Sequence, residues 1–338
     1  MAEKKLIWKR ILLLLVFAVC FLMTACGQGR AVRFGTGNSG GTYYKYGSQL
    51  AAMVSEEGTA DLEVKETAGS AANLRLINEG FLQLAITQGD VLSDAAEGSG
   101  SFEGKDYSGG YGALAALYTE ACQIIVPEDS PAQSAADLAG LRVSIGEEES
   151  GVRKNAEDIL LGYGLTTKMI QPEYLSFTDA AKALEAGEID AFFCTAGAPT
   201  AAVTELASRM EIRLLPIEER VQDNIQNVHQ GYTRTLIPAN TYPGQTEAIS
   251  TLGVKAVLIA SEKMKNEDAA AITRFFLDHR KELCDAIPVL FEEDLTYVTE
   301  NIPCGFHEGA KEVYEEMGIT VVTAKKGSGN TVTGKQEQ

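Results

Sequence analysis

Apolar and polar positions along this chain define two kinds of segment, short buried-type strands and longer helices with one apolar face. Residues 32–34 are predicted to form a strand that leads through the turn GTGNSGG into a helix ending near Glu57. Residues 141–145 repeat the arrangement, because this strand leads through GEEESG into a helix over about residues 152–163. A strand, a Gly/Ser turn and a helix start together indicate the βα unit of a parallel sheet.

A second element is also repeated. A helix that starts at Ser70 ends in LINEG before the strand LQLAI, and a helix that starts at Thr178 ends in LEAG before the strand IDAFF. Gly80 and Gly187 stand where helix C-caps are expected. The order βα…αβ therefore occurs in residues 32–92 and again in residues 141–197, which predicts two similar α/β lobes.

Two further apolar strands, at residues 122–127 and 253–260, are predicted to connect the lobes as a hinge, and a helix follows over about residues 266–283. We expect a two-lobed α/β fold with a mixed or parallel sheet in each lobe. Lobe 1 would comprise residues 32–126 and 252–323, and lobe 2 would comprise residues 127–251. Residues 98–110 are expected to form a glycine-rich surface loop. Residues 324–338 are poor in apolar residues and are predicted to be a disordered tail.

The N-terminus has the pattern of an export signal. A basic start precedes thirteen uninterrupted apolar residues, Ile11 to Met23, a length typical of a signal peptide and too short to cross a bilayer comfortably. The following Thr24-Ala25-Cys26 resembles the lipobox of bacterial lipoproteins. We expect residues 1–25 to be removed, Cys26 to be lipidated, and residues 26–31 to hold the body near the membrane on its extracytoplasmic side. The alternative is an ordinary secretory signal in which Cys26 is incidental.

Composition excludes some partners. The chain has 338 residues, with 29 Lys and Arg against 47 Asp and Glu, so its formal net charge is −18. This acidity argues against a nucleic-acid partner, because neutralising phosphates needs a concentrated basic face. The remaining cysteines show no spacing typical of a metal site, and a Cys284–Cys304 disulfide or buried free thiols are both open: they are Cys122, Cys194, Cys284 and Cys304.

Two motifs are similar to motifs of enzymes, but each lacks the context that the enzyme would need. Gly35, Gly37 and Gly40 match the dinucleotide-binding pattern G-x-G-x-x-G, but nicotinamide cofactors are not freely supplied outside the cell. Ser39 lies in GNSGG, which is similar to the segment around a serine-protease nucleophile, yet none of the three histidines has a recognised catalytic context. We therefore predict no enzyme, no cofactor, no metal and no catalytic residue, and keep a secreted esterase that uses Ser39 as the alternative of another class.

Helix N-termini are the better candidate chemistry. Helices are predicted to start after Gly41, at Ser70 and at Ser150-Gly151. Each start exposes backbone N–H groups with about half a positive charge, which attracts a carboxylate. Simple N-capping by the two serines is the alternative. An acid bound by helix starts from both lobes would join the lobes.

Eight stretches of the chain, between about Val32 and Ile319, resemble the TAXI family of solute receptors that serve TRAP-type secondary transporters. They are GTGNSGGTYYKYGSQLA, TAGSAANLRLINEG, LAITQGDV, ALYTEACQIIVPEDS, DLAGLRVSIG, SGVRKNAEDIL, GEIDAFFCTAGAP and NTYPGQTEAISTLGV. The resemblance implies a periplasmic-binding-protein-like (type II-like) fold that closes on a small carboxylate or amino acid such as glutamate or glutamine, and TRAP membrane subunits as partners. The alternatives are a receptor of an ATP-driven (ABC) importer and a sensory receptor.

The same resemblance implies a set of ligand-binding residues. Asp90 would receive a ligand ammonium or cap the following helix, and Tyr43 would pack on the carbon chain of the ligand. The three acids at positions 147–149 replace small neutral residues of the family, and as a charge run they are expected to point to solvent. Because they would repel an anion if they did not, a cationic or zwitterionic solute stays open. The ligand-binding residues implied are Gly41, Thr42, Tyr43, Ser70, Asn73, Gln88, Asp90, Ser150, Gly151, Ala196 and Gly197.

Overall fold

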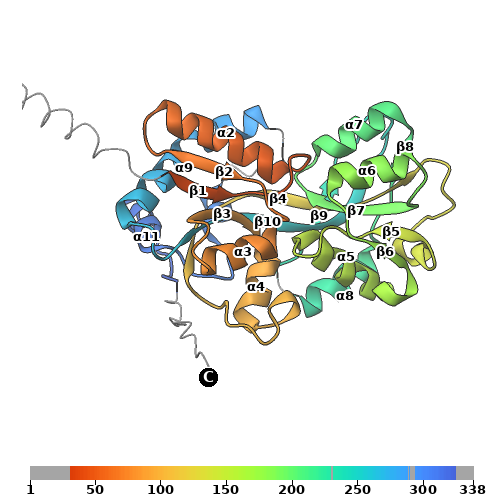
Figure 1. Ribbon diagram of the computed structural model, residues 1–338, viewed down its shortest axis with the longest axis horizontal. Coiled ribbons are helices and arrows are strands. Elements are labelled where there is room, and N and C mark those ends of the chain that lie inside the picture. Colours follow the sequence, from red (N-terminus) through yellow and green to blue (C-terminus); the bar gives the residue numbers. More distant parts are fainter. Residues whose placement is uncertain (1–30, 230, 288, 290–293, 325–338) are drawn as a thin grey trace, which may run out of the picture. The chain divides into compact units, whose positions relative to one another are not determined.

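A computed structural model describes residues 31–229, 231–287, 289 and 294–324. The predicted signal peptide, Cys26 and nearly all of the predicted tail lie outside the described residues. The compact unit that begins at Val32 contains two lobes, the fold class that the sequence predicted (Figure 1). Among the described helices, none combines the length and the apolar character needed to cross a bilayer.

Lobe 1 is built on parallel strands at the start of the chain. Strand β1 pairs in parallel with β2 on one side and with β3 on the other. The elements in chain order are β1 (Val32–Gly35), α2 (Thr42–Glu56), β2 (Leu62–Lys65), α3 (Ser70–Asn78), β3 (Leu84–Gln88), α4 (Gly89–Glu97) and the 3₁₀ turn η1 (Gly100–Phe102). Three helices from the other end of the chain complete this lobe: α9 (Asn266–Ala286), α10 (Leu295–Thr299) and α11 (Glu308–Glu316).

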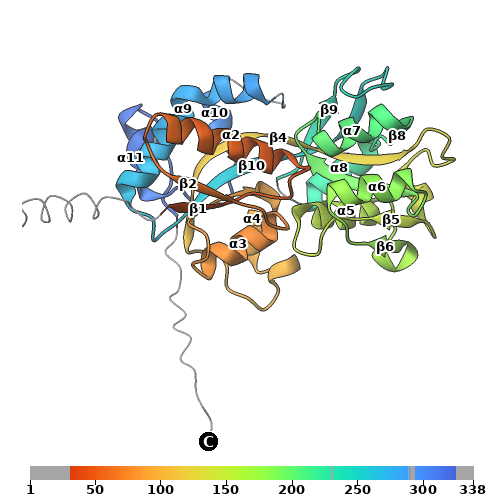
Figure 2. The same cartoon turned by 45° about the horizontal axis from the view of Figure 1, so that its top comes forward.

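Lobe 2 repeats the parallel arrangement, since β5 pairs in parallel with both β6 and β7. Its helices surround this part of the sheet (Figure 2). Its strands and α-helices are β5 (Arg142–Ser144), α5 (Gly151–Gly162), β6 (Gln171–Glu173), α6 (Phe177–Glu185), β7 (Ala191–Ala196), α7 (Ala201–Arg209), β8 (Ile212–Leu214), α8 (Glu219–Val228) and β9 (Thr233–Ile237), with 3₁₀ turns η2 (Ala135–Leu138) and η3 (Thr167–Met169).

Two long antiparallel strands run through both lobes, β4 (Tyr111–Pro127) and β10 (Ile249–Ser261). Within the described residues they are the middle of one sheet with the order β2-β1-β3-β10-β4-β7-β5-β6, while β8 pairs with β4 and β9 with β10. The sequence placed the first of these strands at residues 122–127, but β4 already begins at Tyr111. Its first half is rich in alanine, which has a low strand propensity, and is buried without a polar alternation.

Each lobe has its own apolar core. The core of lobe 1 combines residues 34–118 with residues 256–321, and the core of lobe 2 draws on residues 121–254. In α2 the buried positions recur at the spacing of one helical face, as Tyr43, Tyr46, Gly47, Leu50 and Val54 show. The predicted helix ends are confirmed at both repeats, because Gly80 and Gly187 have φ of +76° and +70°.

Candidate functional site

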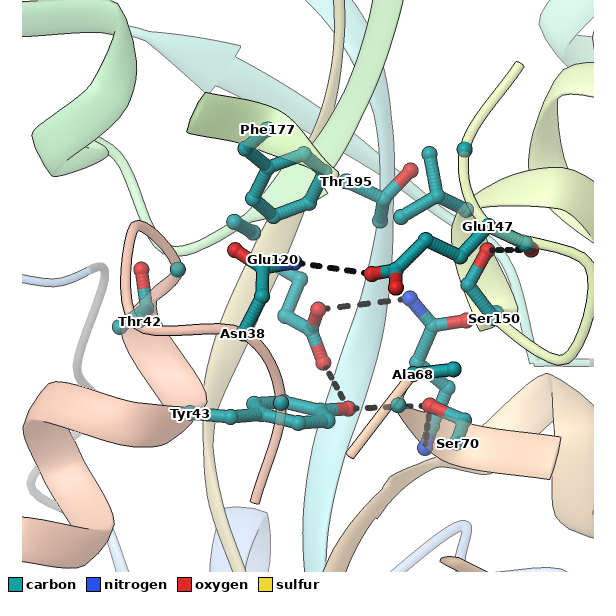
Figure 3. Close-up of a pocket in the computed structure, with 18 of the residues that line it drawn as sticks. Asn38, Thr42, Tyr43, Ala68, Ser70, Glu120, Glu147, Ser150, Phe177 and Thr195 are labelled. Atoms are coloured by element: carbon teal, nitrogen blue, oxygen red, sulfur yellow. Dashed lines mark hydrogen bonds between the residues drawn. The ribbon is translucent and has the colours of Figure 1, made fainter. Parts of the chain in front are cut away.

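A cavity lies between the two lobes, with about 450 Å³ of space not filled by atoms, its mouth included. Lobe 1 contributes the turn before α2, the start of α3 and the ends of β3 and the first half of β4 (Figure 3). Lobe 2 contributes the turn before α5, the start of α6 and the end of β7. The lining residues are Gly37, Asn38, Gly41, Thr42, Tyr43, Ala68, Gly69, Ser70, Gln88, Glu120, Gly146, Glu147, Ser150, Gly151, Val152, Leu175, Phe177, Thr195 and Ala196.

Most of the residues implied by the family resemblance line this cavity. Eight of the eleven do so: Gly41, Thr42, Tyr43, Ser70, Gln88, Ser150, Gly151 and Ala196. The other three, Asn73, Asp90 and Gly197, lie outside it. The Asn73 carboxamide is fully buried in lobe 1 and donates to the backbone oxygens of Thr36 and Ile86 at 2.6 and 2.8 Å. It fixes the turn that carries the cavity wall.

Gly197 and Asp90 contact the opposite lobe instead of the cavity. The carbonyl oxygen of Gly197 accepts a hydrogen bond from the Thr42 hydroxyl at 3.0 Å. Asp90 is the second residue of α4, whose N-cap is Gln88, and the Asp90 carboxylate accepts from Asn155 Nδ2 on α5 at 2.8 Å. Asp90 therefore neither caps α4 nor faces the cavity.

The three helix starts reach the cavity by different means. Helix α2 follows Gly41 in extended conformation, and α3 follows Gly69, whose φ of +116° favours glycine. Ser70 is thus the first residue of α3 and not its cap, and its hydroxyl accepts from the backbone N–H of Gln88 at 3.1 Å. Ser150 does cap α5, because its hydroxyl accepts from the Arg153 N–H at 3.1 Å.

The lobes also bond to each other beside these helix starts. The Ala72 N–H in the first turn of α3 donates to the Glu149 carbonyl oxygen of lobe 2 at 3.0 Å. The Glu149 carboxylate accepts from Arg75 Nε and Nη2 at 2.9 and 2.7 Å. The Ala72 N–H at the start of α3 therefore already has an acceptor in lobe 2.

The expectation that the acids at positions 147–149 point to solvent is wrong for two of the three. Glu149 makes the ion pair with Arg75, and Glu147 lines the cavity, where its carboxylate accepts from Asn38 Nδ2 at 3.3 Å. Only Glu148 is exposed. The turn before α5 lies between the lobes, so Glu147 and Glu149 contact lobe 1 and do not point to solvent. Partial burial raises the pKa of Glu147.

The most buried charged group at the cavity was not predicted. Glu120 lies in the middle of β4, is 2% exposed, and lines the cavity floor. Its carboxylate accepts from the Tyr43 hydroxyl at 2.6 Å and from Gln88 Nε2 at 3.3 Å (Figure 3). The sequence does carry a signal, since Glu120 is the only charged residue of the strand Tyr111–Pro127.

Burial dominates the acidity of Glu120. Loss of hydration raises its pKa to about 8, and the Asp90 carboxylate adds to the rise, whereas the hydrogen bonds from Tyr43 and Gln88 oppose it. The same burial, together with the neighbouring Glu120 charge, raises the pKa of the Tyr43 hydroxyl. The ligand-free floor therefore holds a carboxyl group that is mostly protonated at neutral pH.

Gly151 allows close packing of the two lobes at the cavity. A Cβ atom at this position would collide with the carboxamide of Gln88, which comes from lobe 1. Glycine at the first position of α5 therefore lets the lobes approach without displacing the Gln88 carboxamide.

The three histidines, which the esterase alternative would need as a base, have partners elsewhere in the structure. Each histidine has a partner away from Ser39: His229 lies 3.5 Å from Asp158, His279 lies 3.0 Å from Glu57, and His307 caps α11. These contacts give no histidine to Ser39 as the base that the esterase alternative needs. The four cysteines that the structure describes, among them Cys284 and Cys304, are free thiols. Among the described residues, no group of three or more His, Cys, Asp or Glu is arranged to hold a metal ion.

Comparison with known proteins finds a family whose model matches most of the chain. A model of the NMT1-like family matches residues 34–318. Solved structures with a similar fold include PhnD1 from Prochlorococcus marinus in complex with methylphosphonate, at 11% sequence identity and a TM-score of 0.50 over 85% of this chain and 98% of that one. Another is a protein from Bordetella bronchiseptica RB50, at 16% identity and a TM-score of 0.50 over 88% and 84% of the two chains. A third is the alkanesulfonate-binding protein SsuA from Xanthomonas axonopodis pv. citri, at 17% identity and a TM-score of 0.46 over 78% and 81%.

Proposed function

Because the chain belongs to the NMT1-like family and has a periplasmic-binding-protein-like fold, we propose that it is an extracytoplasmic receptor that binds a small solute between its lobes. One observation carries the proposal: a cavity at the lobe interface is lined by helix starts from both lobes and by a buried acid. The solute that we propose is a small carboxylate or an amino acid, which the TAXI-like stretches of the sequence imply.

Binding in such a cavity is coupled to lobe closure. Gln88 of lobe 1 packs on Gly151 of lobe 2 at the cavity, and Arg75 pairs with Glu149 across the lobes beside it. A solute held by both lobes stabilises this closed arrangement over an open one. The closed form would then be the one that membrane transport subunits recognise.

For the membrane partner we put an ATP-driven importer first. The TRAP assignment made from the sequence is not confirmed by the comparisons, whose family description names no TRAP receptor. A TRAP-type transporter stays the second candidate because of the TAXI-like stretches between Val32 and Ile319. Uptake assays separate the two: collapse of the ion gradient with an ionophore stops TRAP-driven uptake at once, whereas uptake by an ATP-driven importer follows the ATP level.

Membrane attachment through Cys26 is part of the proposal. It is supported by the basic start, the apolar run and the small residues before Cys26. Metabolic labelling with an alkyne fatty acid is expected to tag the wild-type protein and not the Cys26→Ser variant. Equal labelling of both would contradict lipidation at this residue.

The binding proposal is tested by purifying the protein from its native host under non-denaturing conditions and identifying any co-purified small molecule by mass spectrometry. A thermal-shift screen of amino acids, dicarboxylates, sulfonates and phosphonates complements it. We expect at least one member to raise the melting temperature in a concentration-dependent manner. No co-purified molecule and no stabilisation by any member would contradict the proposed function.

A further inference from the structure

One buried acceptor on the cavity floor, Gln88 Oε1, has no donor in the structure. Gln88 and Glu120 are each 2% exposed and both line the cavity. Gln88 Nε2 donates to the Glu120 carboxylate, while Gln88 Oε1 is buried and has no hydrogen-bond partner. When Glu120 is ionised, this contact fixes the carboxamide orientation, because the reverse orientation would set two acceptors against each other. A buried acceptor left unpaired costs free energy, so the floor is built to meet a donor.

The described surroundings supply no cation to the floor. No Lys or Arg side chain is among the residues that line the cavity. The titratable groups around Glu120 are acids or neutral hydroxyls and thiols: Tyr43 on α2, Asp90 on α4, Tyr118 and Cys122 on β4, Cys194 on β7, and Glu147 on the rim. A cation placed on this floor would be stabilised by the ionised Glu120 carboxylate, whereas an anion would meet no opposite charge there.

We propose that the floor of the cavity binds a protonated amine of the solute, which donates its N–H groups to the Glu120 carboxylate and to Gln88 Oε1. This inference rests on the proposed solute-binding function and specifies its ligand. The Tyr43 hydroxyl and Gln88 Nε2 hold the carboxylate in place, and the helix starts at Ser70 and Gly151 leave room on the other walls for an acidic or neutral end. Glu120 is thus the residue that selects amines over carboxylates, sulfonates and phosphonates that lack one.

Binding of an amine also changes the protonation of Glu120. In the ligand-free cavity the pKa of Glu120 is about 8, so about 0.9 of a proton is bound at pH 7. A solute ammonium lowers this pKa, because an opposite charge at contact favours the carboxylate. The ammonium keeps its own protons, the carboxyl proton leaves to solvent, and an ammonium–carboxylate pair remains. Amine binding at pH 7 should therefore release close to one proton.

Calorimetry with matched probes tests this. The probes are L-amino acids and the 2-hydroxy acids of the same carbon skeleton, for example glutamate with 2-hydroxyglutarate and alanine with lactate. Each is titrated at pH 7 in phosphate and in Tris, whose different ionisation enthalpies report the protons released. We expect an amino acid to bind at least about 30-fold more tightly than its hydroxy partner, with release of close to one proton.

Variants of Glu120 test whether this residue causes the amine preference and the proton release. Glu120→Gln is expected to lose the amine preference and the proton release, while Glu120→Asp keeps a preference for the amine. Glu205→Gln on α7, whose side chain is 71% exposed, serves as the matched control and should behave as the wild type. Melting curves of each variant show whether it is folded.

The outcomes distinguish a failure of the amine inference from a failure of the proposed receptor function. If hydroxy acids, dicarboxylates, sulfonates or phosphonates bind as tightly as amines and release no proton, the amine inference is overturned while the receptor function stands. If Glu120→Gln folds and keeps the wild-type amine preference, Glu120 is not the selecting residue and the inference is also overturned. If no solute of any class binds or co-purifies, the proposed function itself fails, and the inference falls with it.

Discussion

Replacement of Lys154 by methionine should weaken the contact between the lobes without touching the cavity. Lys154 lies on α5 of lobe 2, where its Nζ is 2.8 Å from Asp158 Oδ2, and it reaches Asp94 Oδ2 on α4 of lobe 1 at 3.5 Å. The three side chains are only 13–16% exposed. The fully buried Asp90 on α4 adds a further negative charge to the cluster. Methionine keeps the length of the side chain and removes its charge.

The magnitude follows from the burial of the acids. Removing one partner of a buried ion pair costs about 3–5 kcal/mol, because the remaining charge is left without compensation. We expect a loss of about 3 kcal/mol in the free energy of unfolding at pH 8, which for a body of this size lowers the melting temperature by roughly 5 °C. The affinity for the solute should fall as well, because the closed arrangement of α4 and α5 is destabilised.

The pH dependence has a definite sign. Burial raises the pKa of Asp90 to about 6, and it also raises that of Asp94, while Lys154 lowers both. Without Lys154 the pKa values of Asp90 and Asp94 rise further. The two ionised carboxylates then destabilise the folded protein at high pH, and this destabilisation decreases as they become protonated at lower pH. The stability loss of Lys154→Met should be largest at pH 8 and clearly smaller at pH 5.

Melting curves of the wild type and of Lys154→Met at pH 5 and pH 8 measure this loss of stability. Lys182→Met is the matched control, because Lys182 pairs with Asp179 on α6 of the same lobe with its side chain 66% exposed, and its melting temperature should stay within about 1 °C of the wild type. A loss at Lys154 that matches this control, or one that is larger at pH 5 than at pH 8, would refute the reasoning.

Three further predictions concern the cavity and its closure. Burial raises the pKa of Glu120 from 4.5 to about 8, so the ligand-free wild type loses stability as the pH rises between these values, and Glu120→Gln should be more stable than the wild type by about 4 kcal/mol at pH 9 but not at pH 5 in denaturant titrations. Gly151→Ala should weaken binding in calorimetry, because its Cβ would displace the Gln88 carboxamide of lobe 1, whereas Gly89→Ala, with its nearest contact at 3.8 Å, should bind normally. Arg75→Gln removes an ion pair between the lobes and should weaken binding several-fold, more at low than at high salt, while Arg209→Gln, paired within lobe 2, should leave the affinity unchanged.

The fold could be predicted from the sequence because its signals are local. The repeated order of strand, glycine turn and helix indicated two α/β lobes, and the helix ends at Gly80 and Gly187 required only the nearby residues. The first half of β4 was missed, since a run of small apolar residues from Tyr111 carries neither a strand nor a helix period. Its place in the sheet depends on pairing with β10, more than 130 residues later in the chain.

The candidate site was predicted only where it is built from helix starts. The turns before α2, α3 and α5 gave the residues that line the cavity, because glycines and serines mark them in sequence. Asn73 and Asp90 were placed in the site although they lie outside it, since polar residues at a helix start can face a ligand, the core or the other lobe. Glu120 was missed because its position on the floor depends on how β4 and β3 are aligned through β10.

The two strands that run through both lobes also determine the order in which the cores can form as the chain becomes free to fold from its N-terminus. The core of lobe 2 is encoded without interruption by residues 121–254, so it can be assembled as soon as that stretch is free to fold. The core of lobe 1 joins Phe34 to Val321, and its first half must wait, with apolar faces uncovered, for nearly the whole chain. A chain that stops before residue 256 therefore contains one complete core beside an open one, which makes truncated products of this protein a target for chaperones and proteases.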